Sequence, residues 1–493
     1  MSSQQTRVAV LFRRLGPYHH ARLNAAGKMM EIFGVEACGM DDTYAWEKVE
    51  GATSFTRMTL TDRHVEDRSW RRELRRQMWQ ALGRIKPRAV VVPGWSYTDA
   101  LSALSWCLQT NTPVVIMSES TEWDEPRLPW KEWMKRRLVR LCSAALAGGT
   151  PHRDYLVRLG MPAERVFLGY DAVENEHFAC GAKEVRGQRS EVRVKPQSGN
   201  AASSGPVVSG PVVRGQFSAL RARYGLPEKY FLASARFVEK KNLPRLLEAY
   251  ALYRQKAEST KQKGEGTEAE KQKAENKNKF QLSEFQLSAF KNDLCPPTSV
   301  PWSLVLLGDG PLRSTLNSQL STLNLQHSVL LPGFKQYDEL PVYYALASAF
   351  VHASTTEQWG LVVNEAMASG LPVLVSNRCG CAQDLVKDGV NGFTFDPVNV
   401  EQLAALMLRL TETTEHGSPT TRAGTTDHGL RTTQPKTEVN LEDMGKASRE
   451  IISNWGPERF ASGLKSAVKK ALEVGPKRAG ITDRLLLRVL LAR

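Results

Sequence analysis

Short apolar runs separated by amphipathic stretches organise the first part of the chain. Residues 7–12, 89–93 and 113–117 are apolar, and a helical spacing of apolar positions begins near Ala21, after the loop that follows the first run. Short apolar runs that alternate with helices are typical of buried strands in a parallel sheet. Ligands of such sheets bind beyond the carboxyl ends of the strands. The loops after these three strands are therefore candidate ligand contacts.

The second half of the chain repeats the alternation. Residues 231–236 are a predicted strand that ends at Arg236, and residues 304–307 are a second one that runs into a Gly-Asp-Gly-Pro turn. An apolar run at 371–376 follows a short predicted helix. The pattern predicts a second parallel α/β unit.

Three segments interrupt this pattern. Gly, Ser, Pro and charged residues dominate 179–216, whereas Lys, Glu, Gln and Asn dominate 255–299, and Thr, Gly and His dominate 411–439. Such compositions bury too little apolar surface to offset the entropy lost when the chain is ordered. We therefore expect a linker at the first segment, and mobile surface insertions without a catalytic role at the other two.

Composition and charge narrow the class of protein. The 493 residues are 41% hydrophobic and 24% charged, which is typical of two or three globular domains. Neither a bilayer-spanning run of ~20 apolar residues nor a secretory signal is recognisable, so we expect a cytoplasmic protein. The net charge of +14 is spread along the chain without a nucleic-acid-binding module, so no nucleic-acid partner is expected. The seven scattered cysteines match neither a zinc site nor a disulfide framework.

The segment from Glu357 to residue 370 contains the clearest candidate chemistry. Glu357 and Glu365 lie eight residues apart, one before and one inside a short predicted helix that starts at Gly360. A helix N-terminus offers unpaired N–H groups and a positive dipole to an anion. Glu365 lies one turn beyond Leu361 on the same face, where it can accept hydrogen bonds from paired hydroxyls. A ligand with a phosphate at the helix start and a diol one turn further along would be a nucleotide.

Two cations follow the predicted strand at 231–236. Arg236 ends this strand and Lys241 opens the next predicted helix, so both reach beyond the carboxyl edge of the sheet, where a diphosphate would lie. A leaving group that develops negative charge needs such preorganised cations. The alternative for two cations five residues apart is a solvated surface pair.

In their order and spacing, these motifs resemble the nucleotide-sugar-binding half of retaining glycosyltransferase family 4. The motifs are the strand ending at Arg236, the turn at 308–311, the Leu-Pro-Gly-Phe stretch at 331–334, the two glutamates and the turn at 389–393. Each motif alone is weak, but the order of all of them is specific. The resemblance implies a GT-B fold, with two Rossmann-like doubly wound α/β domains facing across a cleft. It also implies transfer of a hexosyl-type sugar from a nucleotide-diphosphate sugar to an acceptor hydroxyl with retention of configuration.

The resemblance assigns roles to single residues. Arg236 and Lys241 would neutralise the donor diphosphate, so no metal and no other cofactor is expected. Glu365 would bind the ribose, and Glu357 would contact or orient the donor sugar. The backbone N–H groups expected to bind phosphate belong to Gly360 and Leu361.

Other positions match the family less closely. Gly16 lies in the loop where the family has a glycine-rich turn near the phosphates, and Lys335 would border the nucleobase. Many relatives have a His at the end of the third strand, where this chain has Glu119. Glu119 either substitutes for that His in binding the sugar or belongs to a site that works differently. His19 and His20 are either ligand contacts or polar surface.

Three positions in the second half have an alternative interpretation. Cys381 and Asp384 replace the second Gly and the Glu of a family Gly-Gly-x-x-Glu stretch, so sugar contact there is left open. Trp359 is either a packing residue or a ligand contact. Asp309, between two glycines, is expected to form a turn rather than to bind a metal.

The predicted final helix at 482–493 is rich in Leu and places Arg484 and Arg488 one turn apart. It either packs on the body of the protein or rests on anionic lipid as a basic amphipathic element. The second alternative would add peripheral membrane association to a cytoplasmic protein.

Together these features predict an acceptor-side domain at 1–178, a donor domain at 217–455, and C-terminal helices at 456–493 that cross back to the first domain. The expected partners are a nucleotide sugar and a glycan, lipid-linked or small-molecule acceptor. A nucleotide-sugar epimerase of the same architecture and a non-catalytic nucleotide-binding protein are the alternatives. A dehydrogenase is disfavoured because no Gly-x-Gly-x-x-Gly follows the first strand.

Overall fold

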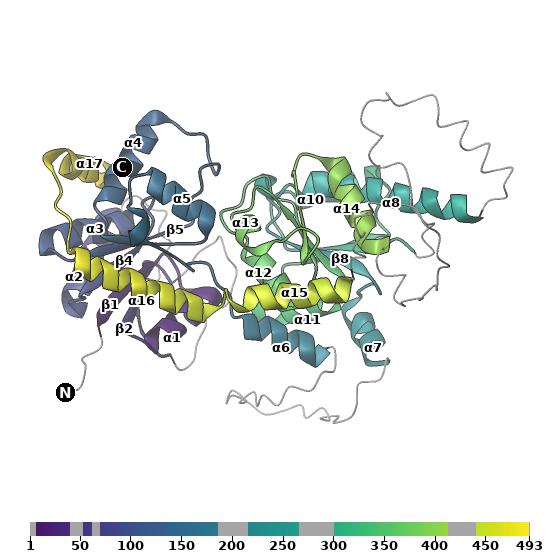
Figure 1. Ribbon diagram of the computed structural model, residues 1–493, viewed down its shortest axis with the longest axis horizontal. Coiled ribbons are helices and arrows are strands. Elements are labelled where there is room, and N and C mark those ends of the chain that lie inside the picture. The colour runs from purple at the N-terminus through teal and green to yellow at the C-terminus, as the bar shows by residue number, and fades with distance from the viewer. Residues whose placement is uncertain are drawn as a thin grey trace, which may run out of the picture.

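Two parallel α/β units make up the protein (Figure 1). The computed structural model describes residues 6–39, 53–61, 70–185, 215–265, 300–412 and 440–492. The strand order is β3-β2-β1-β4-β5-β6-β7 in the N-terminal sheet and β10-β9-β8-β11-β12-β13 in the second sheet. All strand pairs in both sheets are parallel, which confirms the two predicted units.

Helices cover both faces of the N-terminal sheet. Its strands are β1 Arg7–Phe12, β2 Glu31–Glu36, β3 Thr56–Thr59, β4 Ala89–Pro93, β5 Val114–Ser118, β6 Ala144–Ala147 and β7 Val166–Leu168. The helices of this unit are α1 Pro17–Gly27, α2 Arg71–Ile85, α3 Thr98–Thr110, α4 Pro129–Arg140, α5 Thr150–Arg158 and the 3-10 turn η2 Ala163–Arg165. Successive side chains of a strand point to opposite faces. Ala9 and Leu11 therefore join one buried cluster with α2 to α5, while Val8 and Val10 join another with α1.

The second sheet is built in the same way. Its strands are β8 Tyr230–Ser234, β9 Ser303–Leu307, β10 Val329–Gly333, β11 Ala349–His352, β12 Val373–Ser376 and β13 Gly392–Phe395. Its helices are α8 Leu243–Glu265, α10 Arg313–Thr322, α11 Leu340–Leu346, α12 Leu361–Ala368, α13 Ala382–Leu385, α14 Val400–Glu412 and α15 Leu441–Ser453, with the 3-10 turns η3 Glu239–Lys241 and η5 Tyr337–Glu339. Two buried clusters again lie on opposite faces of the sheet.

The chain passes between the two units twice. Helix α6 Asn175–Val185 leaves the N-terminal sheet and packs on α11 and α12, and α7 Gly215–Tyr224 follows it. Helix α16 Pro457–Val474 returns from α15 and packs on α1 and on β4 to β7 (Figure 1). The last helix, α17 Ile481–Ala492, packs on α3 and α4. No helix in the described part of the chain is both long and apolar enough to cross a bilayer.

Several element boundaries differ from the sequence prediction. Helix α1 begins at Pro17, not near Ala21, because a proline is preorganised for the first helical position. Lys241 ends the turn η3 rather than opening a helix, because Asn242 adopts a left-handed conformation (φ 56°) before α8 begins. Helices α6, α8 and α14 extend to Val185, Glu265 and Glu412, into the segments expected to be a linker or insertions. Lys, Glu and Gln are good helix formers and prolong a helix whose earlier turns are anchored. The rest of the three segments, 186–214, 266–299 and 413–439, lies outside the described residues.

In both sheets the strand order reverses beside the first strand of the unit, between β1 and β4 and between β8 and β11. Such switch points open a crevice at the carboxyl ends of the strands. The loops after β1, β5, β8 and β11 leave these ends, and they contain most of the predicted site residues.

Candidate active site

A cavity of about 700 Å³ lies between the carboxyl edges of the two sheets. Tyr18, Glu119 and Asp171 line it from the N-terminal unit, and residues from the loops after β8, β9, β10 and β11 line it from the second unit. The predicted site residues that line the cavity are Arg236, Lys241, Glu357, Gly360, Leu361, Glu365, Glu119 and Lys335. The sheet topology thus brings together predicted site residues that are up to 246 positions apart, from Glu119 to Glu365.

Cations and a helix N-terminus form an anion-binding side of this cavity. Arg236 follows β8, and Lys240 and Lys241 belong to the 3-10 turn η3. Opposite them, Gly360 is the N-cap of α12 with φ +100°, a backbone conformation that favours glycine. The first amides of a helix have no intrahelical acceptor, so those of Leu361 and its neighbour are available to an anion.

Close backbone contacts between two loops fix the position of Arg236. Gly308, after β9, has φ +128°, and a Cβ at this position would lie 1.8 Å from the carbonyl oxygen of Ala235. The amide of Phe237 donates to the carbonyl of Asp309 at 2.8 Å. The Asp309 carboxylate accepts from the amide of Gly310 at 2.7 Å, as expected of a turn-forming residue. Only glycine fits at position 308, which explains the Gly-Asp-Gly stretch in structural terms.

The carboxylate of Glu357 is paired with several donors. Lys241 donates to Glu357 Oε2, the ammonium of Lys240 lies 3.9 Å from Oε1, and His352 Nε2 lies 3.5 Å from Oε2. Burial alone would raise the pKa of Glu357, but the contacts with His352, Lys241 and Lys240 outweigh burial and hold the pKa well below its usual range. Glu357 is therefore ionised at neutral pH, and its charge neutralises part of the cationic side of the cavity.

The second predicted glutamate has a different environment. Glu365 is fully buried, and its two oxygens accept hydrogen bonds from Tyr18 Oη at 2.5 Å and Tyr344 Oη at 2.7 Å. Burial raises the pKa of Glu365 to about 7, although both tyrosine hydrogen bonds act in the opposite direction. The carboxylate thus accepts hydrogen bonds from two tyrosine hydroxyl groups, and ribose binding by Glu365 stays a prediction. Tyr18 comes from α1 of the N-terminal unit, so this contact also joins the two units.

Two acidic side chains of the N-terminal unit face the cavity together. Glu119 follows β5 and Asp171 follows β7, and both line the same cavity. Burial first and the neighbouring Glu119 second raise the pKa of Asp171. Arg22, itself 1% exposed, lies 3.6 Å from Asp171 Oδ1 and donates to the carbonyl of Ala172. The pair occupies the end of the cavity where Glu119 was expected to replace a family histidine.

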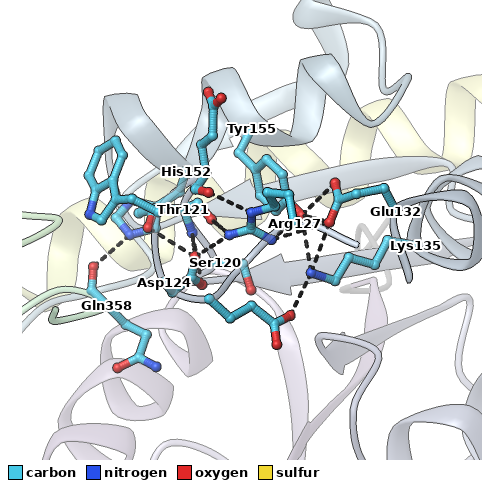
Figure 2. Close-up of polar contacts among 12 residues, drawn as sticks. Ser120, Thr121, Asp124, Arg127, Glu132, Lys135, His152, Tyr155 and Gln358 are labelled. Atoms are coloured by element: carbon cyan, nitrogen blue, oxygen red, sulfur yellow. Dashed lines mark hydrogen bonds and ion pairs between the residues drawn. The ribbon is translucent and has the colours of Figure 1, made fainter. Parts of the chain in front are cut away.

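Contacts between the units position the loop that contains Glu357. The amide of Gly149 donates to His152 Nδ1 at 3.0 Å, so the proton of this buried ring is on Nε2, which donates to the carbonyl of Gln358 at 2.8 Å (Figure 2). Thr150 donates its amide and hydroxyl to the Asp384 carboxylate at 2.8 and 2.6 Å. Asp384, whose sugar contact was left open, therefore binds the opposite unit and does not line the cavity.

Trp359 and His19 both pack against another aromatic side chain, and of the two only Trp359 lines the cavity. The Trp359 side chain is 2% exposed, packs on Trp455 at a centroid distance of 5.1 Å and donates to Asn364. His19 packs on Phe12, and burial lowers its pKa to about 3, so it is neutral and does not reach the cavity.

The expected contact of Gly16 with the ligand stays a prediction, and Gly16 is not among the residues that line the cavity. Gly16 is the N-cap of α1, and its amide donates to His19 Nδ1 at 3.2 Å. Because α1 begins at Pro17, Tyr18 in its first turn is the residue that reaches the cavity.

Sequence reasoning missed Tyr18, Asp171, Lys240 and His352. Lys240 had a usable signal, because it precedes Lys241 in the same loop. His352 also had one, since it ends an apolar strand, β11, at the switch point. Asp171 and Tyr18 had none, because they lie 186 and 339 positions from Glu357. Among the described residues, no group of three or more His, Cys, Asp or Glu is arranged to hold a metal ion.

Comparison with known proteins agrees with this geometry. Residues 283–424 match the family model described as glycosyl transferases group 1. The matched residues include the strands β9 to β13 and the helix α12 of the second unit. Sulfoquinovosyl transferase SQD2 of Arabidopsis thaliana is 39% identical over 101 residues, which are 20% of this chain and 19% of that protein. The alpha-monoglucosyldiacylglycerol synthase of Streptococcus pneumoniae is 42% identical over 71 residues, which are 14% of this chain and 16% of that protein.

These sequence matches cover only part of each relative. An uncharacterized glycosyltransferase of Methanocaldococcus jannaschii is 37% identical over 101 residues, and the chain spans 26% of its length. The chain therefore spans about a quarter or less of the length of these three relatives.

Solved structures match over almost the whole chain. HepE of Anabaena in complex with UDP and glucose has a TM-score of 0.59 at 15% identity, covering 94% of this chain and 99% of that chain. WaaG, a glycosyltransferase involved in lipopolysaccharide biosynthesis, has a TM-score of 0.53 at 12% identity, covering 93% of this chain and 98% of that chain. These likenesses concern the fold, and they confirm the expected GT-B fold.

The raised pKa of Glu365 makes stability depend on pH. The folded protein holds this proton up to about pH 7, whereas an unfolded Glu loses it near its ordinary pKa of 4.5. A carboxyl whose pKa is raised by folding contributes most stability below its unfolded pKa, and this contribution is lost as pH rises through the folded pKa. Glu365→Gln mimics the protonated form, so its unfolding free energy relative to wild type should rise by up to about 3 kcal/mol between pH 4.5 and 8.

Denaturant titrations of both proteins at several pH values measure this difference. A difference that stays constant across the range would contradict the assigned pKa. Asp338→Asn, at an exposed carboxylate outside the Glu365 contacts, is the control and should show no such slope.

Proposed function

We propose that the protein is a retaining glycosyltransferase that transfers a sugar from a nucleotide-diphosphate donor to an acceptor hydroxyl. The observation that carries this proposal is the order of groups in one cavity. The cations of the β8 loop and the α12 N-terminus suit a diphosphate, and Glu365, one turn along α12, suits a ribose. Glu357 and the Glu119–Asp171 pair line the remaining space, where the sugar would be held.

The proposed donor site works by charge neutralisation. Cleavage of the bond between sugar and diphosphate develops negative charge on the leaving oxygen, which Arg236, Lys240 and Lys241 stabilise without a reorganising solvent. Because Lys241 is paired with Glu357, the diphosphate competes for a cation that is already held in place. The carboxylate of Glu357 is then available to accept hydrogen bonds from the sugar hydroxyls.

The acceptor hydroxyl would approach on the same face as the leaving diphosphate, which gives retention of configuration. The leaving diphosphate itself takes the acceptor proton, so no separate general base is required. Relatives named as alpha-monoglucosyldiacylglycerol synthases favour a lipid-linked acceptor over a glycan or a small molecule.

Arg236 and Lys241 should each contribute to binding of the diphosphate. Replacing either residue by Ala should weaken UDP binding by about 1.5–3 kcal/mol, the scale for losing a hydrogen bond to a charged group, or about 10- to 100-fold in Kd. Isothermal titration calorimetry with UDP as the probe measures this loss. Lys446→Ala, at an exposed cation on α15, is the matched control. Unchanged UDP affinity in both site variants would show that Arg236 and Lys241 do not bind the diphosphate.

Activity should not require a divalent metal, because three side-chain cations and the α12 N-terminus take the diphosphate charge. Turnover in excess EDTA should equal turnover without it. Complete loss that magnesium or manganese restores would show that the donor site is built around a metal.

Glu365 and Glu357 should have separable effects. Glu365→Gln should weaken UDP and the nucleotide sugar alike, because the ribose is present in both. Glu357→Gln should leave UDP affinity near wild type while turnover falls, as expected when an interaction acts mainly in the transition state. Calorimetry and steady-state kinetics on the same preparations test this division. Equal loss of UDP binding in both variants, or unchanged turnover in both, would show the division to be wrong.

A further inference from the structure

Exposed apolar side chains gather on one part of the N-terminal unit. Six of the thirteen exposed large hydrophobic residues in the described part of the chain lie on α17, on α4 or at the α4 N-cap. They are Leu128, Trp130, Trp133, Ile481, Leu485 and Val489. Figure 1 shows α17 beside α4, and the two helices are in contact. We call these six residues and the exposed basic residues Arg136, Arg140, Arg484 and Arg488 the α4–α17 face.

The exposed apolar side chains of α17 lie on one side of the helix. Ile481, Leu485 and Val489 follow each other at a spacing of four residues, and Arg484 and Arg488 lie on the adjoining stripe. Leu486 and Leu487 are buried against the protein, so the opposite stripe is the one that anchors the helix. Ile481 is 90% exposed and Leu485 is 60% exposed, and a contiguous exposed apolar patch of this kind marks an interaction site.

Helix α4 contributes two indoles to the same surface. Trp130 is 52% exposed and Trp133 is 47% exposed. The guanidinium of Arg137 lies 5.3 Å from the centroid of the Trp133 ring and donates to Asp483 at the start of α17 at 2.9 Å. This contact holds the tryptophan stripe of α4 against the beginning of α17, so the two helices form one surface.

Buried polar contacts make α4 a rigid support. Arg127, just before the helix, bonds Asp124 and Glu132, and its guanidinium lies 4.6 Å from the centroid of the Tyr155 ring (Figure 2). Lys135, 8% exposed, donates to Glu132 and to Tyr155. The loop braced in this way begins at Glu119, which lines the cavity, and ends at Leu128, which belongs to the face.

We propose that the α4–α17 face docks on an anionic lipid bilayer. Tryptophan side chains are favoured at the boundary between lipid headgroups and acyl chains, and basic residues beside them are attracted to anionic headgroups. Arg136 and Arg140, which are exposed and share α4 with the two indoles, supply part of this positive charge. A second copy of the chain is a poorer occupant, because a twofold interface would bring Arg484 and Arg488 close to their own copies.

Vesicle co-sedimentation of the full chain tests the docking without nucleotide or turnover, so its outcome is independent of the proposed glycosyltransferase activity. The probe is vesicles of equal parts phosphatidylcholine and phosphatidylglycerol, compared with phosphatidylcholine alone. Wild-type protein should sediment with the anionic vesicles at low salt and stay in the supernatant at high salt. The double variant Trp130→Ser/Trp133→Ser should bind at least tenfold more weakly, while its melting curve by circular dichroism stays that of wild type.

Two double variants test the contribution of the basic residues to vesicle binding. Arg484→Gln/Arg488→Gln should lower the partition coefficient about 25-fold, since each cation near an anionic surface contributes about 1 kcal/mol. Lys465→Gln/Lys469→Gln removes two exposed cations at the same spacing from α16, which covers the opposite face of the sheet, and should leave binding unchanged.

Three outcomes would overturn the proposal. One is wild-type protein that does not bind anionic vesicles. Another is a tryptophan variant that binds them as wild type does. The third is a wild-type dimer in light scattering that the tryptophan variant converts to a monomer, which would assign the face to a second copy of the chain.

Discussion

The buried contact of Glu357 with Lys241, Lys240 and His352 joins the three segments on which the candidate site depends. The lysines come from the loop after β8, the histidine ends β11, and Glu357 opens the loop that leads to α12. If Lys241 were removed, the buried carboxylate of Glu357 would lose an ion-pair partner, and an uncompensated buried charge is costly in a low-dielectric interior. The contact therefore fixes the cations and the α12 N-terminus relative to each other before any ligand arrives.

Contacts from the N-terminal unit complete this arrangement from the other side of the cleft. His152 holds the carbonyl of Gln358, directly after Glu357, and Tyr18 donates to Glu365 one turn into α12. Both glutamates are thus connected to the opposite unit, directly or through a neighbour. Since a ribose bound by Glu365 would use the position that Tyr18 occupies, nucleotide binding and the relative placement of the two units are physically coupled.

The sequence predicted those features that depend on local pattern. Apolar runs predicted the positions of the strands. Because a helix repeats every 3.6 residues, the spacing of Glu357, Gly360 and Glu365 predicted the N-terminus of α12. Features that depend on how distant segments meet were not predictable. Tyr18 and Glu365 lie 347 residues apart, and the partners of Asp384 and Asp171 likewise come from other parts of the chain. Tyr18 rather than Gly16 lines the cavity, because α1 begins at Pro17 and Tyr18 lies in its first turn. The final helix was predicted as amphipathic, but only the structure shows that α4 extends its apolar face with two tryptophans.

The proposal that this cleft cleaves a nucleotide-diphosphate sugar and transfers the sugar can be tested by product analysis after incubation with a panel of nucleotide sugars and acceptors. We expect one donor to stabilise the protein against heat and turnover to release free nucleoside diphosphate, with the sugar joined to the acceptor in its original anomeric configuration. Recovery of an epimerised nucleotide sugar with its diphosphate intact, or thermal stabilisation by none of the donors, would contradict it.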